Sequence, residues 1–157
     1  MREDKALPIV PVEPVPFTAN YAWSVGVMME KFIKSLADKK LFAAKCPNCG
    51  YTYVPPRNRC GKCGAKIEEN DMVELSGKGR LLSSTDASLD LDGSGNFVEL
   101  DTPRIICAVV FEGADSTLFL PLVDGGDDVL LSGTEMDIVW NKETTGSIKD
   151  IAGVKQA

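Results

Sequence analysis

Four of the five cysteines lie in two Cys-x-x-Cys-Gly motifs, at residues 46–50 and 60–64. Each motif is typical of a tight turn that points two sulfurs at one ion, and its glycine lets backbone amide groups reach those sulfurs. The intervening segment is long enough for a short hairpin. The spacing therefore predicts a tetrahedral four-thiolate zinc site in a zinc ribbon. The predicted ligands are Cys46, Cys49, Cys60 and Cys63.

Four protein sulfurs saturate a zinc ion and leave no open position for water or substrate, so the predicted zinc is structural. Two other uses of paired cysteines stay open at this point. A rubredoxin-like iron centre has similar turns, usually with a wider gap between them. A thioredoxin-like redox pair also uses a Cys-x-x-Cys motif.

The other residue types limit what the chain can catalyse. It has 157 residues, a net charge of −6 and no histidine, which excludes every serine–histidine, cysteine–histidine and histidine–metal arrangement. Cys107 lies in an apolar strand-like run, so we expect a small core residue. Asp127 and Asp128 could act as catalytic carboxylates, but adjacent acids in Asp-Gly-Gly-Asp-Asp are typical of a turn.

Charge is distributed unevenly along the chain. Residues 39–66 hold seven bases and no acid, whereas residues 67–157 have a net charge of −12. Even with about −2 from a four-thiolate zinc centre, the predicted ribbon is a positive region on an acidic protein. Its expected partners are nucleic-acid backbone, the phosphates of a nucleotide cofactor, or an acidic protein surface. A solvated face with no partner is the alternative.

Two elements precede the cysteine motifs. Four prolines between residues 8 and 16 predict an extended proline-rich arm over residues 1–21. Apolar residues then recur at spacings of three and four, which predicts an amphipathic helix over residues 22–42. The predicted apolar stripe consists of Val25, Met28, Met29, Phe32, Ile33 and Leu36.

The predicted zinc ribbon covers residues 43–68, and a β-rich segment covers residues 69–157. Five short runs with no helix-length segment between them predict a small antiparallel barrel or sandwich. The runs are residues 79–85, 104–111, 117–123, 135–140 and 147–152. Pro121 indicates an edge or bulge position in the third run. Residues 86–101 are predicted to form a long loop between the first two strands.

The order of these elements resembles the DUF35 family, whose members combine a rubredoxin-like zinc ribbon with an OB-fold. The resemblance covers about residues 22–152. Its most specific part, residues 36–80, contains Leu-Phe-Ala-Ala-Lys-Cys-Pro-Asn-Cys-Gly, Tyr-Val-Pro-Pro-Arg, Cys-Gly-Lys-Cys-Gly and Gly-Lys-Gly-Arg-Leu-Leu. The resemblance implies a mainly β fold: an N-terminal helix, a four-cysteine zinc ribbon and a five-stranded OB-fold barrel.

The same resemblance implies a non-catalytic accessory subunit. DUF35 proteins bind thiolase-superfamily subunits that make or break carbon–carbon bonds in acyl-CoA substrates, and they can help enclose the CoA. The implied assembly is a hetero-oligomer with structural zinc and a CoA or acyl-CoA shared with the partner, which would supply the nucleophile and the base. Contacts to CoA or the partner are expected near Tyr53, Arg57, Lys78 and Arg80.

Among pathways, the resemblance favours anaerobic breakdown of aromatic compounds, in which an aryl β-ketoacyl-CoA such as benzoylsuccinyl-CoA is cleaved. Two other settings stay open. One is the archaeal-type assembly of acetoacetyl-CoA thiolase and hydroxymethylglutaryl-CoA synthase, and the other is side-chain degradation of sterols.

The main alternative function is nucleic-acid binding, which zinc ribbons and OB-folds both serve. Binding of single strands normally needs a basic groove with exposed aromatics. The barrel segment is acidic, and its aromatics mostly lie in strand patterns that indicate the core. These aromatics are Phe97, Phe111, Phe119 and Trp140. No apolar run is long enough to cross a bilayer and the first residues lack a secretion signal, so we expect a cytoplasmic protein.

Overall fold

A computed structural model describes residues 22–123 and 130–157. The predicted proline-rich arm and the Asp127–Asp128 pair lie outside the described residues. The elements are α1 (Val27–Leu36), β1 (Leu41–Lys45), β2 (Thr52–Tyr53), η1 (Glu69–Asp71), β3 (Met72–Leu75), β4 (Lys78–Leu91), β5 (Phe97–Phe111), β6 (Leu118–Pro121), β7 (Glu135–Trp140), η2 (Ile148–Asp150) and β8 (Ile151–Gln156). Within these ranges no helix is long and apolar enough to span a membrane.

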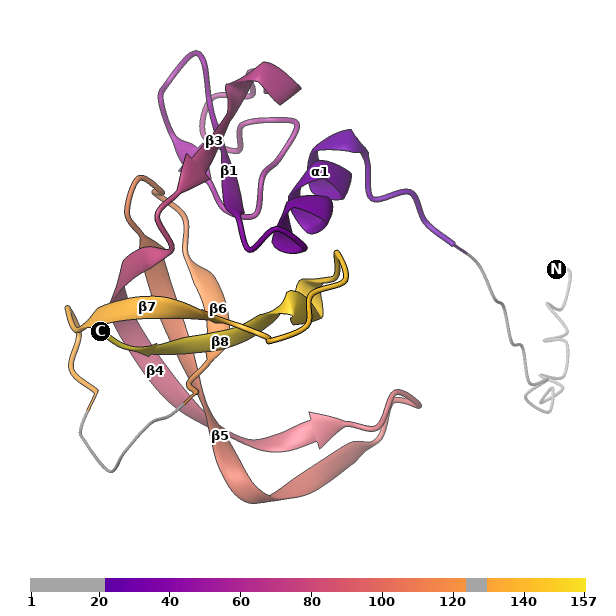
Figure 1. Cartoon of the computed structure of the whole chain (residues 1–157), viewed down its shortest axis with the longest axis vertical. Coiled ribbons are helices and arrows are strands. Elements are labelled where there is room, and N and C mark those ends of the chain that lie inside the picture. The colour runs from indigo at the N-terminus through magenta and orange to yellow at the C-terminus, as the bar shows by residue number, and fades with distance from the viewer. Residues whose placement is uncertain (1–21, 124–129) are drawn as a thin grey trace, which may run out of the picture.

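The strands form two antiparallel sheets (Figure 1). A three-stranded sheet, in the order β2-β1-β3, carries the cysteine motifs, and a five-stranded sheet has the order β6-β5-β4-β7-β8. The larger sheet curls until its outer strands meet. Leu122 forms a parallel bridge with Val154, and the Val123 N–H donates to the Val154 carbonyl at 2.8 Å. The result is a five-stranded, partly open barrel of the OB type, and the predicted fold class is confirmed.

Pro121 ends β6, an outer strand of the sheet, and this confirms the predicted edge position. The last predicted strand is displaced along the chain. Residues 148–150 form the short helix η2, and β8 begins only at Ile151. The reason is Asp150, which is buried and accepts the N–H groups of Gly146 and Ser147, so that the chain curls before the strand starts.

Helix α1 is shorter than the predicted range of residues 22–42. Gly26, with a φ of 79°, precedes the helix. Lys39, with a φ of 57°, ends the helical turns, and its N–H donates to the Leu36 carbonyl at 3.0 Å. The chain then enters β1 at Leu41. The helix therefore spans only the part of the apolar stripe that packs on the rest of the chain.

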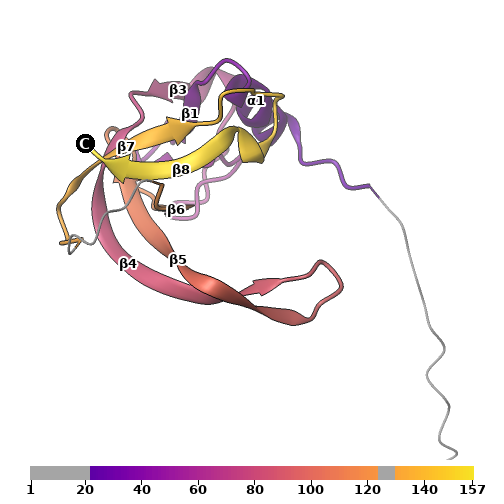
Figure 2. The same cartoon turned by 60° about the horizontal axis from the view of Figure 1, so that its bottom comes forward.

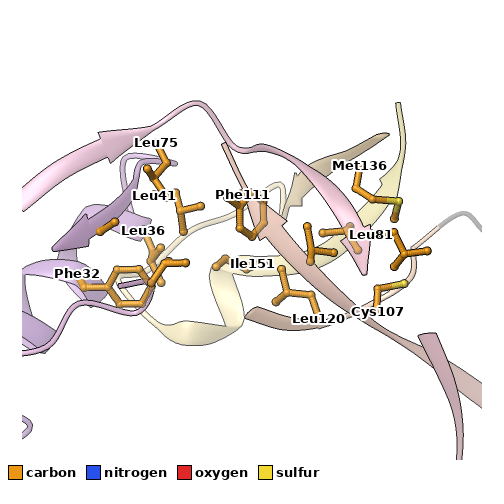
Figure 3. Close-up of a cluster of buried hydrophobic side chains, with 14 residues drawn as sticks. Phe32, Leu36, Leu41, Leu75, Leu81, Cys107, Phe111, Leu120, Met136 and Ile151 are labelled. Atoms are coloured by element: carbon orange, nitrogen blue, oxygen red, sulfur yellow. The ribbon is translucent and has the colours of Figure 1, made fainter. Parts of the chain in front are cut away.

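Helix, ribbon and barrel share a core. Phe32 and Leu36, one turn apart on α1, are fully buried. Figure 3 shows a chain of buried side chains that runs from these two residues through Phe111 and Ile151 to Leu81 in the barrel. Because the cluster is continuous, the helix is packed against the barrel and is not attached to the ribbon alone.

The predictions for Cys107 and for the aromatic residues have different outcomes. Cys107 is fully buried, which confirms a core residue, and this burial raises the pKa of its thiol. Phe111 is also fully buried. The core prediction is wrong for Phe97 and Phe119, which are 72% and 68% exposed. Phe119 lies on the outer strand β6, and Phe97 lies beyond the barrel.

The predicted long loop over residues 86–101 is instead a β-hairpin. Strand β4 continues to Leu91 and β5 begins at Phe97, so that only residues 92–96 form the connecting turn. In that turn the Asp92 side chain accepts the N–H groups of Ser94 and Asn96. The loop prediction failed because these strand segments are exposed and lack the alternation of buried apolar and exposed polar residues that marks a strand.

Candidate metal centre and adjoining groove

The four cysteines of the two motifs come together at one point of the three-stranded sheet. Their sulfurs all lie within 4.8 Å of one another. The Cys46 and Cys63 sulfurs are 3.6 Å apart, as are those of Cys49 and Cys60. Tetrahedral zinc with Zn–S bonds of about 2.3 Å places its sulfurs roughly 3.8 Å apart. The arrangement therefore fits a four-thiolate zinc ion and supports the predicted structural metal.

The two motifs fold into nearly identical turns. The Gly50 N–H donates to the Cys46 carbonyl, and the Gly64 N–H donates to the Cys60 carbonyl, each at 2.9 Å. Both glycines have a left-handed φ, of 75° and 74°, which a residue with a side chain rarely adopts. This backbone geometry aims both cysteines of each motif at the same ion.

Cys46 and Cys60 are buried, and they belong to a small cluster separate from the main core. The other buried members of this cluster are Met28, Ala44, Tyr53 and Ile67. So few apolar side chains give the turns little core of their own. The metal must therefore supply most of the free energy that holds them.

Tyr53 stabilises the metal centre through its hydroxyl group. Its hydroxyl accepts the Gly61 N–H at 3.0 Å, and it lies 3.4 Å from the Cys60 sulfur, to which it can donate its proton. The Tyr53 hydrogen bond is the main reason why the pKa of Cys60 is lowered to about 6. A lowered pKa favours the thiolate, which is the form that binds zinc.

A Tyr53→Phe variant is expected to release zinc faster than the wild type. Loss of the hydroxyl removes a hydrogen bond to a metal ligand, and such losses typically weaken metal affinity by about 10-fold or more. Zinc transfer to a coloured chelator measures the rate. Tyr51→Phe is the matched control, because the Tyr51 hydroxyl donates to the Asp115 carbonyl and not to a ligand. Equal release by both variants would contradict the assignment.

The ribbon is fixed to the barrel by hydrogen bonds between β2 and the turn that joins β5 to β6. The Thr52 N–H donates to the Asp115 carboxylate at 2.8 Å, and the Thr52 carbonyl accepts the Asp115 N–H at 2.9 Å. The Val54 N–H donates to the Ser116 hydroxyl at 2.7 Å. These bonds set the orientation of the metal centre relative to the barrel.

A groove of about 790 Å³ lies between the start of α1 and the ribbon. We call it the helix–ribbon groove. One side is apolar, and the other, the basic side, carries three bases and two acids, Glu68 and Glu69, with Lys66 ion-paired to Glu68 at 2.7 Å. Its apolar residues include Val25, Met28 and Met29, and its basic residues are Arg57, Arg59 and Lys66. The Arg57 guanidinium lies 5.3 Å from the centre of the Tyr53 ring.

The four residues expected to contact CoA or the partner fall into two pairs. Tyr53 is buried beneath the metal centre, and Arg57 lines the helix–ribbon groove beside it. Lys78 and Arg80 are exposed on β4 in the barrel, and they lie across from acidic residues of β7. No contact to CoA is tested by this placement, so the four assignments stay predictions.

Sequence reasoning did not single out Arg59, Lys66 and the helix methionines as members of one site. The signal that could have found them was the positive segment directly after an amphipathic helix. That signal is weak, because neither the helix nor the ribbon defines the groove alone. Only the packing of α1 against the ribbon places its methionines opposite the arginines.

Comparisons with known proteins agree with this geometry. Residues 34–68 match the family model described as the ChsH2 rubredoxin-like zinc ribbon domain. A DUF35 domain-containing scaffold protein from Methanocaldococcus jannaschii is 44% identical over 41 residues. That match covers 26% of this chain and only 28% of the relative.

Two solved structures match most of the chain. A DUF35-family protein of unknown function from Sulfolobus solfataricus is 26% identical with a TM-score of 0.61, over 84% of this chain and 87% of that chain. The Ltp2-ChsH2(DUF35) aldolase is 17% identical with a TM-score of 0.57, over 80% of this chain and 91% of that chain. At that identity the second match shows the fold alone.

Proposed function

The chain has the zinc ribbon and the fold of the DUF35 proteins, and from this premise we propose that it is a non-catalytic subunit of an acyl-CoA enzyme. In this proposal it binds a thiolase-superfamily partner and helps to enclose an acyl-CoA during carbon–carbon bond cleavage or formation. The observation that carries the proposal is the helix–ribbon groove. Its volume of about 790 Å³ is in the range of small-molecule sites.

The two sides of the groove match the two chemical parts of an acyl-CoA. Arginine forms charge-assisted hydrogen bonds with phosphate oxygens, and Arg57 and Arg59 stand on one side. The apolar side, with Met28 and Met29, fits the pantetheine and acyl portions. Zinc and the hydrogen bonds from β2 to the barrel hold the basic side in place, so that little ordering is needed when ligand binds.

The chain's own composition supports a partner that performs the reaction. With no histidine, the chain lacks the commonest general base at neutral pH. The zinc that fits the four sulfurs would have no open position for substrate. The similar proteins, one described as a scaffold protein and the other as an aldolase that contains a DUF35 chain, support the same role.

The finer part of the proposal concerns the partner and the substrate. We propose a thiolase-like catalytic subunit and an aryl β-ketoacyl-CoA such as benzoylsuccinyl-CoA, from the anaerobic breakdown of aromatic compounds. This part rests on the family resemblance and not on a feature of the groove.

Purification of the tagged chain from its native host tests the partnership. A thiolase-superfamily chain is expected to co-elute in a fixed molar ratio and to show acyl-CoA cleavage or condensation. A chain that purifies alone would overturn the proposal.

Filter binding to single-stranded DNA tests the alternative, because micromolar affinity that falls steeply with salt would favour a nucleic-acid role.

An Arg57→Ala variant is expected to weaken CoA binding by the purified complex about 10-fold, since a hydrogen bond to a charged group is lost. Isothermal titration with CoA measures the change. Lys149→Ala is the matched control, because Lys149 is an exposed base on η2, outside the groove. Parallel Lys78→Ala and Arg80→Ala variants test the barrel pair. If Arg57→Ala binds CoA like the wild type, the groove is not the CoA site.

A further inference from the structure

The β4–β5 hairpin extends well beyond the barrel. Strand β4 pairs with β7 only as far as Arg80, and β5 pairs with β6 only from Ile106 onward. Residues 86–105, which we call the hairpin arm, therefore pair with each other alone. Figures 1 and 2 both show this two-stranded hairpin curving away from the rest of the molecule. The six residues from Asp86 to Leu91 give it a reach of about 20 Å.

One face of the hairpin arm is mainly apolar, with Glu99 across from Leu89. Leu91 and Phe97 are directly opposite each other across the two strands, and Leu89 lies two residues before Leu91 on the same face. These residues are 51% (Leu89), 60% (Leu91) and 72% (Phe97) exposed. We call them the arm face. Val98, paired with Asp90, lies on the opposite face.

An arm of this kind is not expected to stand alone in water. A two-stranded hairpin without a third strand or a helix against it is marginally stable. Single exposed apolar residues are common on protein surfaces. Several of them on one face of a projecting element are typical of an interaction site. In the described part of the chain, the arm face is not part of either buried cluster.

The charges around the arm face define what could cover it. The hairpin arm contains five acids and one base, a net charge of −4. The base, Arg104, forms an ion pair with Asp90 at 3.0 Å. The other acids are exposed along the arm. They are Asp86, Asp92, Glu99 and Asp101. A complementary surface has an apolar centre bordered by lysine and arginine.

We propose that the hairpin arm is the element that docks on the catalytic partner, with the arm face against an apolar patch that basic residues border. This inference rests on the proposed function. A second copy of the chain is the competing occupant, because its helix–ribbon groove is also apolar and basic. The proposed function gives that groove to the acyl-CoA, and a hairpin arm seated there would exclude the substrate.

The test uses the full chain co-expressed with the thiolase-superfamily subunit from the same genome. A Leu91→Asp/Phe97→Asp variant places two charges on the arm face, and Val98→Asp places one on the opposite face as the matched control. Affinity for the partner is expected to fall at least 30-fold in the double variant, as at an interface hot spot. It is expected to change less than about 3-fold in the control. Zinc content and unfolding temperature verify that both variants fold.

The outcomes separate this inference from the proposed function. If the double variant binds the partner as tightly as the wild type does, the arm is not the docking element, although the chain is still an accessory subunit. If the wild-type chain binds no thiolase-superfamily subunit, the proposed function fails and the inference fails with it. Sedimentation that shows self-association in the wild type, lost in the double variant, would assign the arm face to a second copy and overturn the inference.

Discussion

A Cys60→Ser variant is expected to lose zinc and, with it, the ordered structure of residues 43–68. The two motif turns belong to a buried cluster with few apolar members, so the metal supplies most of their stability. Binding of structural zinc contributes about 10–16 kcal/mol to the folding of zinc-finger peptides. A hydroxyl does not replace a thiolate ligand, and the three remaining sulfurs no longer saturate the ion.

The barrel is expected to stay folded in this variant. Of the core cluster that it shares with the ribbon, only Ala43 and Val54 fall within residues 43–68, and its outer strands still meet at Leu122 and Val154. Hydrogen exchange measured by mass spectrometry would show peptides from 43–68 exchanging rapidly and peptides from β5 remaining protected. Metal analysis would show less than one zinc per chain.

Cys107→Ala is the matched control for the loss of a thiol. Cys107 is buried in the barrel and does not belong to the metal cluster, so the variant is expected to keep its zinc and its protected ribbon. Should Cys60→Ser retain full protection over 43–68, the metal would not be structural. In that case the basic side of the helix–ribbon groove would have to be held by the hydrogen bonds from β2 to the barrel alone.

The metal centre could be predicted from sequence because its determinants are local. Within each motif, the cysteine spacing and the following glycine dictate the turn. The two turns need only a short hairpin to meet. Four of the five barrel strands could be recognised for a similar reason, since each has buried or half-buried positions that give a β pattern. The place of Cys107 in the core could be predicted from the apolar run in which it lies.

The hairpin arm and the groove could not be predicted: the groove depends on contacts between distant segments, and the strands of the arm are exposed. The arm is held by pairing between β4 and β5, and its exposed strands carry no pattern that distinguishes them from a loop. The groove depends on the packing of α1 against the ribbon, which places Met29 and Arg57 on the lining of the same groove. The end of α1 at Leu36 likewise carries no glycine or proline signal, because Lys39 adopts the left-handed φ of 57° that ends the helical turns.

A Phe32→Ala variant is expected to lower the free energy of unfolding by about 3–5 kcal/mol, the usual cost of truncating a buried phenylalanine. Phe32 is fully buried where α1 meets the main core. The total free energy of unfolding of a typical domain is only about 5–15 kcal/mol. Since helix and barrel share this core, the barrel should lose stability together with the helix. Urea unfolding followed by hydrogen exchange of β5 and by zinc release measures both parts.

Val27→Ala on the same helix is the matched control, because Val27 is 54% exposed, and its expected effect is within about 0.5 kcal/mol. The two readouts distinguish two arrangements of the molecule. If the urea midpoints for β5 protection and for zinc release both fall, the helix stabilises the ribbon and the barrel as one unit. If only zinc release shifts, the helix belongs energetically to the ribbon, and the shared core would not couple the metal centre to the barrel. Coupling of this kind is what would let a ligand in the helix–ribbon groove act on the barrel that carries the hairpin arm.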